Sequence, residues 1–264
     1  MVACLSSMRC SASFHAAPVS SPAHILSPPK NKRAEAANLF FETRVVTMAA
    51  APRKLTIGII GFGNFGQFLA KTFTQQGHRV IGSSRADYTA QAQEVGAEFV
   101  KSPDEMLDLS PDVVILSMSI MSFESVLARL PLERFSSKLI VDVLSVKVFP
   151  HDVLLKTLPA DADILCTHPM FGPESGRHGW TGLPMVYDAV RVADKGRVEA
   201  FLGMFAEAGC SMVEMSCEEH DAYAASTQFV THFTGRVLGG LGLESTPINT
   251  KGYESLLGVV DTTC

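Results

Sequence analysis

The chain has 264 residues, of which 47% are hydrophobic, and a formal net charge of −5 at pH 7. This length and apolar content suffice for a large domain with a sizeable core plus a smaller domain. The acidic balance argues against a nucleic-acid-binding surface, which needs an excess of basic side chains. No apolar stretch reaches the roughly 18 to 20 residues that cross a bilayer, so we expect a soluble protein that acts on a small molecule.

Residues 1–50 differ in composition from the rest of the chain. They are rich in Ser, Ala and Pro, carry scattered basic side chains, and have no acidic residue before Glu35. This composition is typical of an import sequence, and the repeated breaks between its apolar residues argue against a secretory signal. We therefore expect a transit peptide that directs the protein to the chloroplast stroma. A mitochondrial presequence, a disordered tail and an internal start at Met48 are the alternatives.

In residues 54–216, apolar strands alternate with amphipathic helices. This pattern predicts an α/β domain with a Rossmann-type, doubly wound and mostly parallel sheet. The expected strands are 55–60, 79–81, 97–100, 112–117, 139–143, 163–167, 184–187 and 211–215. The expected helices are 65–76, 91–95, 103–109, 123–130, 149–158 and 197–208. One helix start is explicit, because Ser102 and Glu105 have the spacing of a capping box and Pro103 takes the first helical position.

After Ser216 the strands stop and helical patterns follow. Residues 218–241 predict one long helix, and another begins at 253–260. We expect residues 217–264 to begin an α-helical substrate and dimerisation domain that is cut short at Cys264. Later helices and a second subunit would cover the apolar face of the long helix, so part of that face should stay exposed here. This face comprises Tyr223, Phe229, Phe233, Val237 and Leu241.

The six cysteines include no CxxC pair and no metal-ligand spacing with histidine. Neither a metal site nor a disulfide framework is therefore predicted. Cys166 stands two residues before His168, which leaves open a thiol nucleophile with a nearby base. An ordinary strand cysteine is the favoured interpretation.

The clearest motif is a glycine-rich run, Gly61-Phe62-Gly63-Asn64-Phe65-Gly66, between an apolar strand and an amphipathic helix. In such a run the first glycine permits the tight turn, the second lets the backbone approach a pyrophosphate, and the third allows close packing of helix on strand. The free amides at the helix start then bind phosphates. We predict a dinucleotide site at this turn and at the end of a neighbouring strand. Its residues are Gly61, Gly63, Asn64, Phe65, Gly66, Ser117 and Ser119.

The end of the second strand distinguishes NAD from NADP. An NAD site places an acidic residue there for the ribose hydroxyls, and such a carboxylate would repel a 2′-phosphate. This sequence instead has Ser83, Ser84 and Arg85. Two hydroxyls and a guanidinium suit a phosphate, so NADP is the predicted cofactor. The alternatives are that Asp87 turns back into the site or that Arg85 is a solvated loop charge.

Ligands of doubly wound sheets bind beyond the carboxyl ends of the strands. His168 ends a predicted strand and precedes Pro169, so its imidazole should lie at the mouth of the cleft. With a pKa near the operating pH, a neutral imidazole there can accept a hydroxyl proton while a hydride leaves the same carbon. Ser145, which follows another strand, is available to hydrogen-bond that imidazole or the substrate hydroxyl. The alternative is that His168 is a structural turn residue.

In their order and spacing, Gly61–Gly66, Asp142–Lys147 and His168–Gly176 together resemble the arogenate/prephenate dehydrogenase family, most of all its plant plastidial members. The resemblance runs from about Lys54 to the end of the chain. It implies NADP-dependent oxidative decarboxylation of arogenate to tyrosine, or the corresponding reaction of prephenate, and a homodimer for complete members.

The same resemblance implies roles for four residues. His168 would be the base toward the ring hydroxyl and Ser145 its orienting partner. Ser175 and Gln228 would belong to the substrate pocket.

This chain departs from the family pattern in two ways. Family members continue into further helices, whereas this chain stops at Cys264. Members that prefer prephenate carry an arginine near residues 252–258, and its absence here favours arogenate.

Two other interpretations of the function remain. One is an NADP oxidoreductase of the hydroxyacid or imine-reducing kind, for which the long helix offers only Asp221 near its start. The other is a truncated cofactor-binding remnant without activity.

Overall fold

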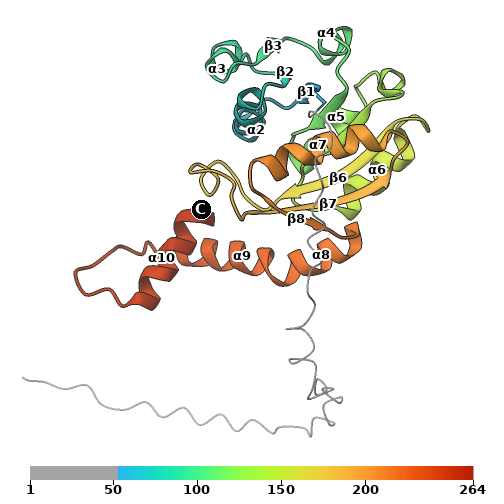
Figure 1. The fold of residues 1–264 in the computed structure, drawn as a ribbon. Helices are drawn as coiled ribbons and strands as arrows, with labels where there is room; N and C mark the ends of the chain where they lie inside the picture. The colour runs from blue at the N-terminus through green and yellow to red at the C-terminus, as the bar shows by residue number, and fades with distance from the viewer. Residues whose placement is uncertain (1–52, 264) are drawn as a thin grey trace, which may run out of the picture. The chain divides into compact units, whose positions relative to one another are not determined.

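The computed structural model describes residues 53–263, which are built on one eight-stranded sheet (Figure 1). The strand order is β3-β2-β1-β4-β5-β6-β7-β8, and every neighbouring pair is parallel except β6 and β7. The strands are β1 (Thr56–Ile60), β2 (Arg79–Ser83), β3 (Glu98–Val100), β4 (Val113–Leu116), β5 (Leu139–Asp142), β6 (Asp163–Pro169), β7 (Pro184–Arg191) and β8 (Ser211–Glu214). The predicted Rossmann-type sheet is therefore confirmed. The predicted transit peptide lies outside the described residues.

Helices connect the strands and continue after the last one. They are α2 (Asn64–Gln75), α3 (Thr89–Glu94), α4 (Pro103–Asp108), α5 (Phe123–Leu127), α6 (Val148–Thr157), α7 (Lys195–Glu207), α8 (Cys217–Ser226), α9 (Gln228–Gly239) and α10 (Lys251–Thr263), with short 3₁₀ turns at Ile120–Ser122 and Leu132–Phe135. In the part of the chain that the structure describes, no helix combines the length and apolar content needed to span a bilayer.

The central strands are buried on both faces, which explains their continuous apolar runs. In β4, Val113 and Ile115 belong to one apolar cluster, and Val114 and Leu116 belong to the other. Aromatic side chains of α2 and α7 fill the first cluster, and side chains of α4, α5 and α6 fill the second. This two-sided packing holds the carboxyl ends of β1, β4, β5 and β6 in fixed positions, which is where ligands of such sheets bind.

Two helix starts differ from the prediction. At α4, the Ser102 hydroxyl accepts from Glu105 N at 3.2 Å, as expected. The Glu105 carboxylate, however, accepts from the amide of Lys101 instead of Ser102, so the reciprocal arm of the predicted box is shifted by one residue. A complete capping box, which was not predicted, begins α8, where Ser216 and Glu219 cap one another's backbone amides.

The single long helix predicted over 218–241 is wrong, because the structure has two helices, α8 and α9, that meet at Thr227. Thr227 leaves the helical region with φ −120° and ψ −71°. The hydroxyls of Ser226 and Thr227 both donate back to the Tyr223 carbonyl, at 3.0 and 2.7 Å. Such back-bonding by Ser and Thr bends helices, and two consecutive residues do so here.

The predicted exposure of the apolar face on these helices is confirmed. Its members are Tyr223, Phe229, Phe233, Val237 and Leu241, which are 52% to 67% exposed. The rings of Phe229 and Phe233 stack with their centroids 5.8 Å apart. On the other side of α9, α10 folds back so closely that a Cβ atom at Gly235 would lie 1.7 Å from the Thr263 hydroxyl oxygen. The domain boundary at Ser216 stays a prediction.

Candidate active site

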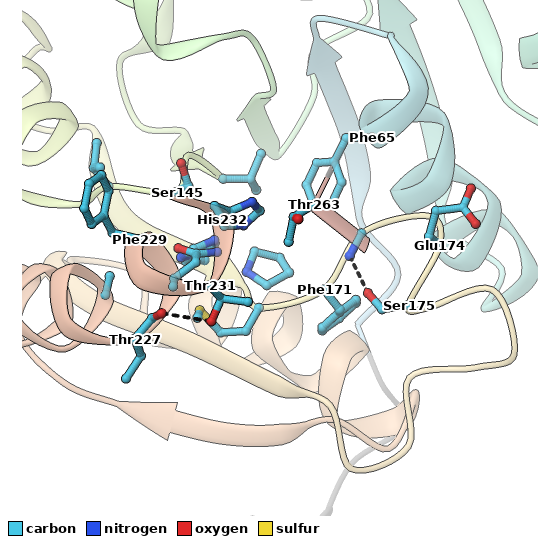
Figure 2. Close-up of a pocket in the computed structure, with 18 of the residues that line it drawn as sticks. Phe65, Ser145, Phe171, Glu174, Ser175, Thr227, Phe229, Thr231, His232 and Thr263 are labelled. Carbon is cyan, nitrogen blue, oxygen red and sulfur yellow. Dashed lines mark hydrogen bonds between the residues drawn. The ribbon is translucent and has the colours of Figure 1, made fainter. Parts of the chain in front are cut away.

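A cavity of about 1190 Å³ lies between the carboxyl ends of β5 and β6 and the helices α8, α9 and α10 (Figure 2). All four predicted catalytic and substrate residues line it, although they come from four separate segments. They are Ser145, His168, Ser175 and Gln228. Figure 2 shows Phe65, His232 and Thr263 gathered in the middle of the cavity, with Glu174 and Ser175 to one side. The structure thus brings together residues that stand more than 80 positions apart in the sequence.

A smaller cavity of about 280 Å³ adjoins the first and shares Phe65 and Val143 with it. It is bordered by the start of α2 and by the segment that follows β4. Of the residues predicted to bind the dinucleotide, it includes Gly63, Asn64, Phe65, Gly66, Ser117 and Ser119. A cofactor in the small cavity would therefore face a substrate in the large one.

The three glycines of the turn have the geometry that a dinucleotide requires. Gly61 has a φ of +97°, and a Cβ atom there would lie 2.1 Å from the Ser117 carbonyl oxygen. A Cβ atom at Gly66 would lie 2.6 Å from the Gly61 carbonyl oxygen, so the helix packs directly on the turn. At Gly63 a Cβ atom would meet nothing within 4 Å, which leaves open space beside the backbone.

The start of α2 is also suited to an anion. Its N-cap, Gly63, provides no side-chain hydrogen bond, and its first turn has no acidic residue. The first amides of the helix can therefore serve a ligand, and the helix dipole favours a negative charge there. The residues present fit a pyrophosphate.

The segment after β2 contains an orphaned polar atom. The Ser83 hydroxyl is buried and, within residues 53–263, has no hydrogen-bond partner. Leaving a buried hydroxyl unpaired is unfavourable by about 1 to 3 kcal/mol, so this position suits a ligand atom that would pair with it. Ser84 is half-buried and Arg85 is exposed, and none of the described residues forms a hydrogen bond or ion pair with the Arg85 side chain.

Asp87 does not turn back toward this segment. Its carboxylate accepts hydrogen bonds from the amide and the hydroxyl of Thr89, at 2.9 and 2.6 Å. These two bonds, the hydroxyl first, lower the pKa of Asp87. Its carboxylate is therefore engaged at the start of α3, and the alternative of an Asp87 that binds the ribose loses its support.

His168 is buried at the end of β6 and forms part of a hydrogen-bonded chain. Its Nδ1 lies 2.8 Å from Nε2 of His220, and Nδ1 of His220 lies 2.8 Å from an Asp221 oxygen. The Asp221 carboxylate also accepts from the amides of Lys147 and Val148, at 2.8 and 2.9 Å, where α6 begins. These hydrogen bonds thus connect the start of α6, through Asp221 and His220, to His168, the predicted base.

Ser145 is the predicted orienting partner of His168, but in the structure Nδ1 of His168 is hydrogen-bonded to His220. Ser145 lines the cavity and is exposed, and the described structure contains no hydrogen bond between it and His168. A role for Ser145 toward the substrate hydroxyl stays a prediction. His220 was missed and Asp221 was considered only for another class of enzyme, although the Ser216–Glu219 capping box just before them was a readable signal.

The environment of His168 keeps its imidazole neutral. Burial, then the Lys147 ammonium, then His220 lower the pKa of His168 to about 3, while Asp221 acts in the opposite direction. This value corrects the expectation of a pKa near the operating pH. Lys147 is itself buried, where its ammonium pairs with the Asp142 carboxylate and donates to the Thr167 carbonyl at 2.6 Å.

Asp221 stays ionised although it is partly buried. Burial tends to raise its pKa, but the hydrogen bonds from Val148 N, His220 and Lys147 N outweigh that effect, and the pKa is lowered overall. The hydrogen-bonded chain therefore ends in a carboxylate that can only accept hydrogen bonds.

Cys166 is not an activated nucleophile. A hydrogen bond with the Cys217 thiol, followed by burial, raises the pKa of the Cys166 thiol far above its ordinary value. Because the thiolate is the nucleophilic form, the structure favours the interpretation of an ordinary strand cysteine.

Arg236 on α9 is a further cavity residue that sequence reasoning missed. The sequence prediction concerned only the absence of an arginine at residues 252–258. Arg236 nevertheless supplies an exposed guanidinium to the same cavity from another helix. Of the described residues that line the cavity, the acidic ones are Glu174 and Asp221.

Comparisons with known proteins agree with this arrangement. Residues 56–146 match the family described as NADP oxidoreductase, coenzyme F420-dependent, and residues 237–264 match one described as TYRAAT1-like, C-terminal domain. The chain is 52% identical over 252 residues to arogenate dehydrogenase 2, chloroplastic, of Arabidopsis thaliana, a match that covers 92% of this chain and 70% of that protein.

Two further comparisons differ in how much of the relative they cover. Arogenate dehydrogenase 1, chloroplastic, of the same plant is 55% identical over 215 residues, covering 80% of this chain but 34% of that protein. Among solved structures, prephenate dehydrogenase from A. aeolicus in complex with hydroxyphenyl propionate and NAD+ has a TM-score of 0.62 at 20% identity, covering 81% of this chain and 80% of that chain. At that identity the likeness concerns the fold.

Proposed function

This chain belongs to the arogenate/prephenate dehydrogenase family of oxidoreductases, and we propose from this premise that it converts arogenate to tyrosine by NADP-dependent oxidative decarboxylation. The observation that carries the proposal is the junction of two cavities, one at the glycine turn and one that contains a buried, neutral His168. Prephenate is the alternative substrate. Because both Arabidopsis relatives are chloroplastic, we further propose that the enzyme acts in the plastid stroma.

The proposed chemistry needs few ionisable groups. The nicotinamide, when bound, supplies the hydride acceptor. His168 accepts the proton of the ring hydroxyl while the hydride leaves the same carbon, and the bond to the ring carboxylate then breaks to release carbon dioxide. Its low pKa makes His168 available as a neutral acceptor near pH 7. Since loss of carbon dioxide makes the ring aromatic, the driving force comes from the substrate and not from a strong base.

The choice of NADP rests on the segment after β2. Ser83, Ser84 and Arg85 offer two hydroxyls and a guanidinium, and the described structure gives neither the Ser83 hydroxyl nor Arg85 a partner. A 2′-phosphate would satisfy these donors with charge-assisted hydrogen bonds. Asp87 does not compete for the ribose there, because its carboxylate is engaged by Thr89.

Charged and polar groups of the large cavity support an amino-acid substrate. Arg236 can pair with a carboxylate, and Ser175, whose hydroxyl accepts from Gly172 N at 3.0 Å, can donate its proton to one. Gln228 adds an amide from the start of α9. Asp221 is engaged by α6 and His220, so Glu174 is the cavity-lining acid that remains for the ammonium group of arogenate.

The direct test is the appearance of NADPH absorbance when the protein is mixed with NADP+ and arogenate, prephenate or a panel of hydroxyacids. We expect arogenate to be turned over with the highest kcat/KM and the hydroxyacids not at all. Release of carbon dioxide in equal amount to NADPH identifies the decarboxylation. Turnover of a hydroxyacid without carbon dioxide release would assign the protein to another oxidoreductase class. A protein that binds NADP+ in a titration but turns over none of these compounds would support the inactive alternative.

A further inference from the structure

The charge of Asp221 determines which atoms donate and which accept in the hydrogen bonds that join Asp221, His220 and His168. Asp221 is ionised and can only accept, so the hydrogen between it and His220 must belong to Nδ1 of His220. In a neutral His220 ring, Nε2 is then an acceptor. The 2.8 Å contact therefore requires Nδ1 of His168 to donate, which leaves Nε2 of His168 with its lone pair.

We propose that His220 and Asp221 are positioning residues, which hold His168 as its Nδ1–H tautomer and so present the unprotonated Nε2 to the substrate hydroxyl. The proposal rests on the proposed function, because it assigns these residues to the same proton transfer. Without an acceptor at Nδ1, a histidine ring is free to carry its hydrogen on either nitrogen, and the Nε2–H form cannot act as a base.

Because both rings are buried, the hydrogen bond between His168 and His220 has no alternative partner in water. The side chains of His168 and His220 are both buried, with exposed fractions of 5% and 3%, so water does not substitute for either partner. Their ring centroids are 5.0 Å apart with the planes inclined by 63°, which matches an in-plane hydrogen bond from one ring to the edge of the other. A buried ring nitrogen with its partner removed would be left unsatisfied.

The same residues also compensate the charge that forms during the reaction. When the substrate O–H bond breaks, its proton bonds to Nε2 of His168, and the ring becomes an imidazolium. The Nδ1 hydrogen is then shared with His220, whose other nitrogen faces the negative Asp221 carboxylate. The added proton leaves later from Nε2 through the cavity that His168 lines.

Two hydrogen bonds from Lys147 connect these residues to the sheet. Lys147 donates its backbone amide to Asp221 and its ammonium group to the carbonyl of Thr167, the residue that precedes His168. The other charged or titratable groups that line the same cavity are Glu174, His232 and Arg236. None of these three has a hydrogen bond to the His168 ring in the described structure, so the tautomer depends on His220.

A purely structural role is the competing explanation, because Asp221 also caps the start of α6. The two explanations separate in variants of His220. In His220→Gln the amide oxygen can still accept from Nδ1 of His168, whereas in His220→Leu no acceptor remains. Positioning therefore predicts that His220→Leu lowers kcat for arogenate by about 10- to 100-fold with KM nearly unchanged, and that His220→Gln retains most of the turnover.

The test combines kinetics with a measurement that needs no turnover. Long-range ¹H–¹⁵N correlation spectra of protein with labelled histidine distinguish protonated from unprotonated ring nitrogens, and His168→Gln assigns the His168 signals. We expect the wild type to show Nδ1 protonated and Nε2 unprotonated, and His220→Leu to show a mixture. His78→Gln is the matched control, because His78 is a buried histidine that accepts from Leu55 N at 3.1 Å and lines neither of the two cavities. It should lower stability but leave the His168 tautomer and the turnover per folded molecule unchanged.

The outcomes are decisive in both directions. A wild-type His168 protonated at Nε2, or equal turnover of His220→Leu and wild type, would overturn the positioning role. Equal losses in His220→Leu and His220→Gln without a change of tautomer would assign His220 a structural role only. If the tautomer shifts as expected but the wild type does not oxidise arogenate, the positioning role stands and the proposed function fails.

Discussion

The two halves of the candidate site are built in different ways. The cofactor half is made by backbone that packs closely at its glycines, because a Cβ atom at Gly61 would clash with the Ser117 carbonyl oxygen at 2.1 Å. The substrate half is made by side chains from β6, α8, α9 and the loops after β5 and β6, and much of the helical face beside it is exposed. The backbone of the cofactor half suits the pyrophosphate that NAD and NADP share, so a preference between them depends on the few side chains after β2. In the substrate half, side chains form most of the cavity wall, and we expect them to determine the reaction.

The strongest test of this comparison is to replace His168, the proposed base. His168→Asn should lower kcat by about 10² to 10⁴-fold, the usual contribution of a positioned general base, and leave the Kd of NADP+ nearly unchanged. Steady-state kinetics and a cofactor titration measure the two quantities. The control is His78→Asn, which should keep full turnover per folded molecule. An unchanged kcat in His168→Asn would remove His168 from the mechanism.

A second substitution addresses the cofactor half alone. Arg85→Ala should weaken the binding of NADP+ by about 1.5 to 3 kcal/mol and leave NAD+ binding nearly unchanged, because it removes a charge-assisted hydrogen bond to the 2′-phosphate. Arg79→Ala, at the other end of β2, is the matched control, since Arg79 pairs with Glu98 at 2.7 Å. Equal losses for both cofactors would show that Arg85 does not recognise the phosphate.

The third test is the dependence of stability on pH, because His168 is buried in its neutral form. Its pKa is about 3 in the folded protein, against 6.5 for an unperturbed histidine, so between these values the unfolded chain binds more protons. The free energy of unfolding should therefore fall as pH falls below 6.5, by up to about 1.4 kcal/mol per pH unit from this group. Chemical denaturation at about pH 7 and about pH 5 measures the slope, which His168→Asn should reduce. An identical slope in the variant would mean that His168 is not the group responsible.

The smallest expected effect concerns substrate choice. Glu174→Gln should reduce the preference for arogenate over prephenate by only a few-fold, because an exposed ion pair contributes about 0.2 to 1 kcal/mol. The ratio of the two kcat/KM values measures this preference. Glu218→Gln, an exposed substitution on α8 that does not line the cavity, should leave the ratio unchanged. A preference that survives in Glu174→Gln would assign recognition of the ammonium group to another residue.

The sequence could predict features that depend on neighbouring residues, but not those that depend on contacts between distant ones. The sheet and the glycine turn were predictable, because a run such as Gly61–Gly66 determines its own conformation locally. The break at Thr227 was not anticipated, since it depends on two hydroxyls that bond backward to one carbonyl.

Similarly, the pairing of His168 with His220 joins residues 52 positions apart, and no local pattern specifies that contact. His168, Ser175 and Gln228 were correctly grouped at one cavity, but the partner that orients His168 required the structure.

The chain of contacts behind His168 has a consequence for the time course of folding. The contact of Asp221 with Lys147 spans 74 residues, and it requires β5, β6, β7, β8 and the start of α8 to be in place. Contacts of such long sequence separation form slowly, whereas the turn at Gly61 joins β1 to α2 directly. During refolding from denaturant, recovery of NADP+ binding should therefore precede recovery of turnover. His168, the proposed base, would then be among the last side chains to reach its final position.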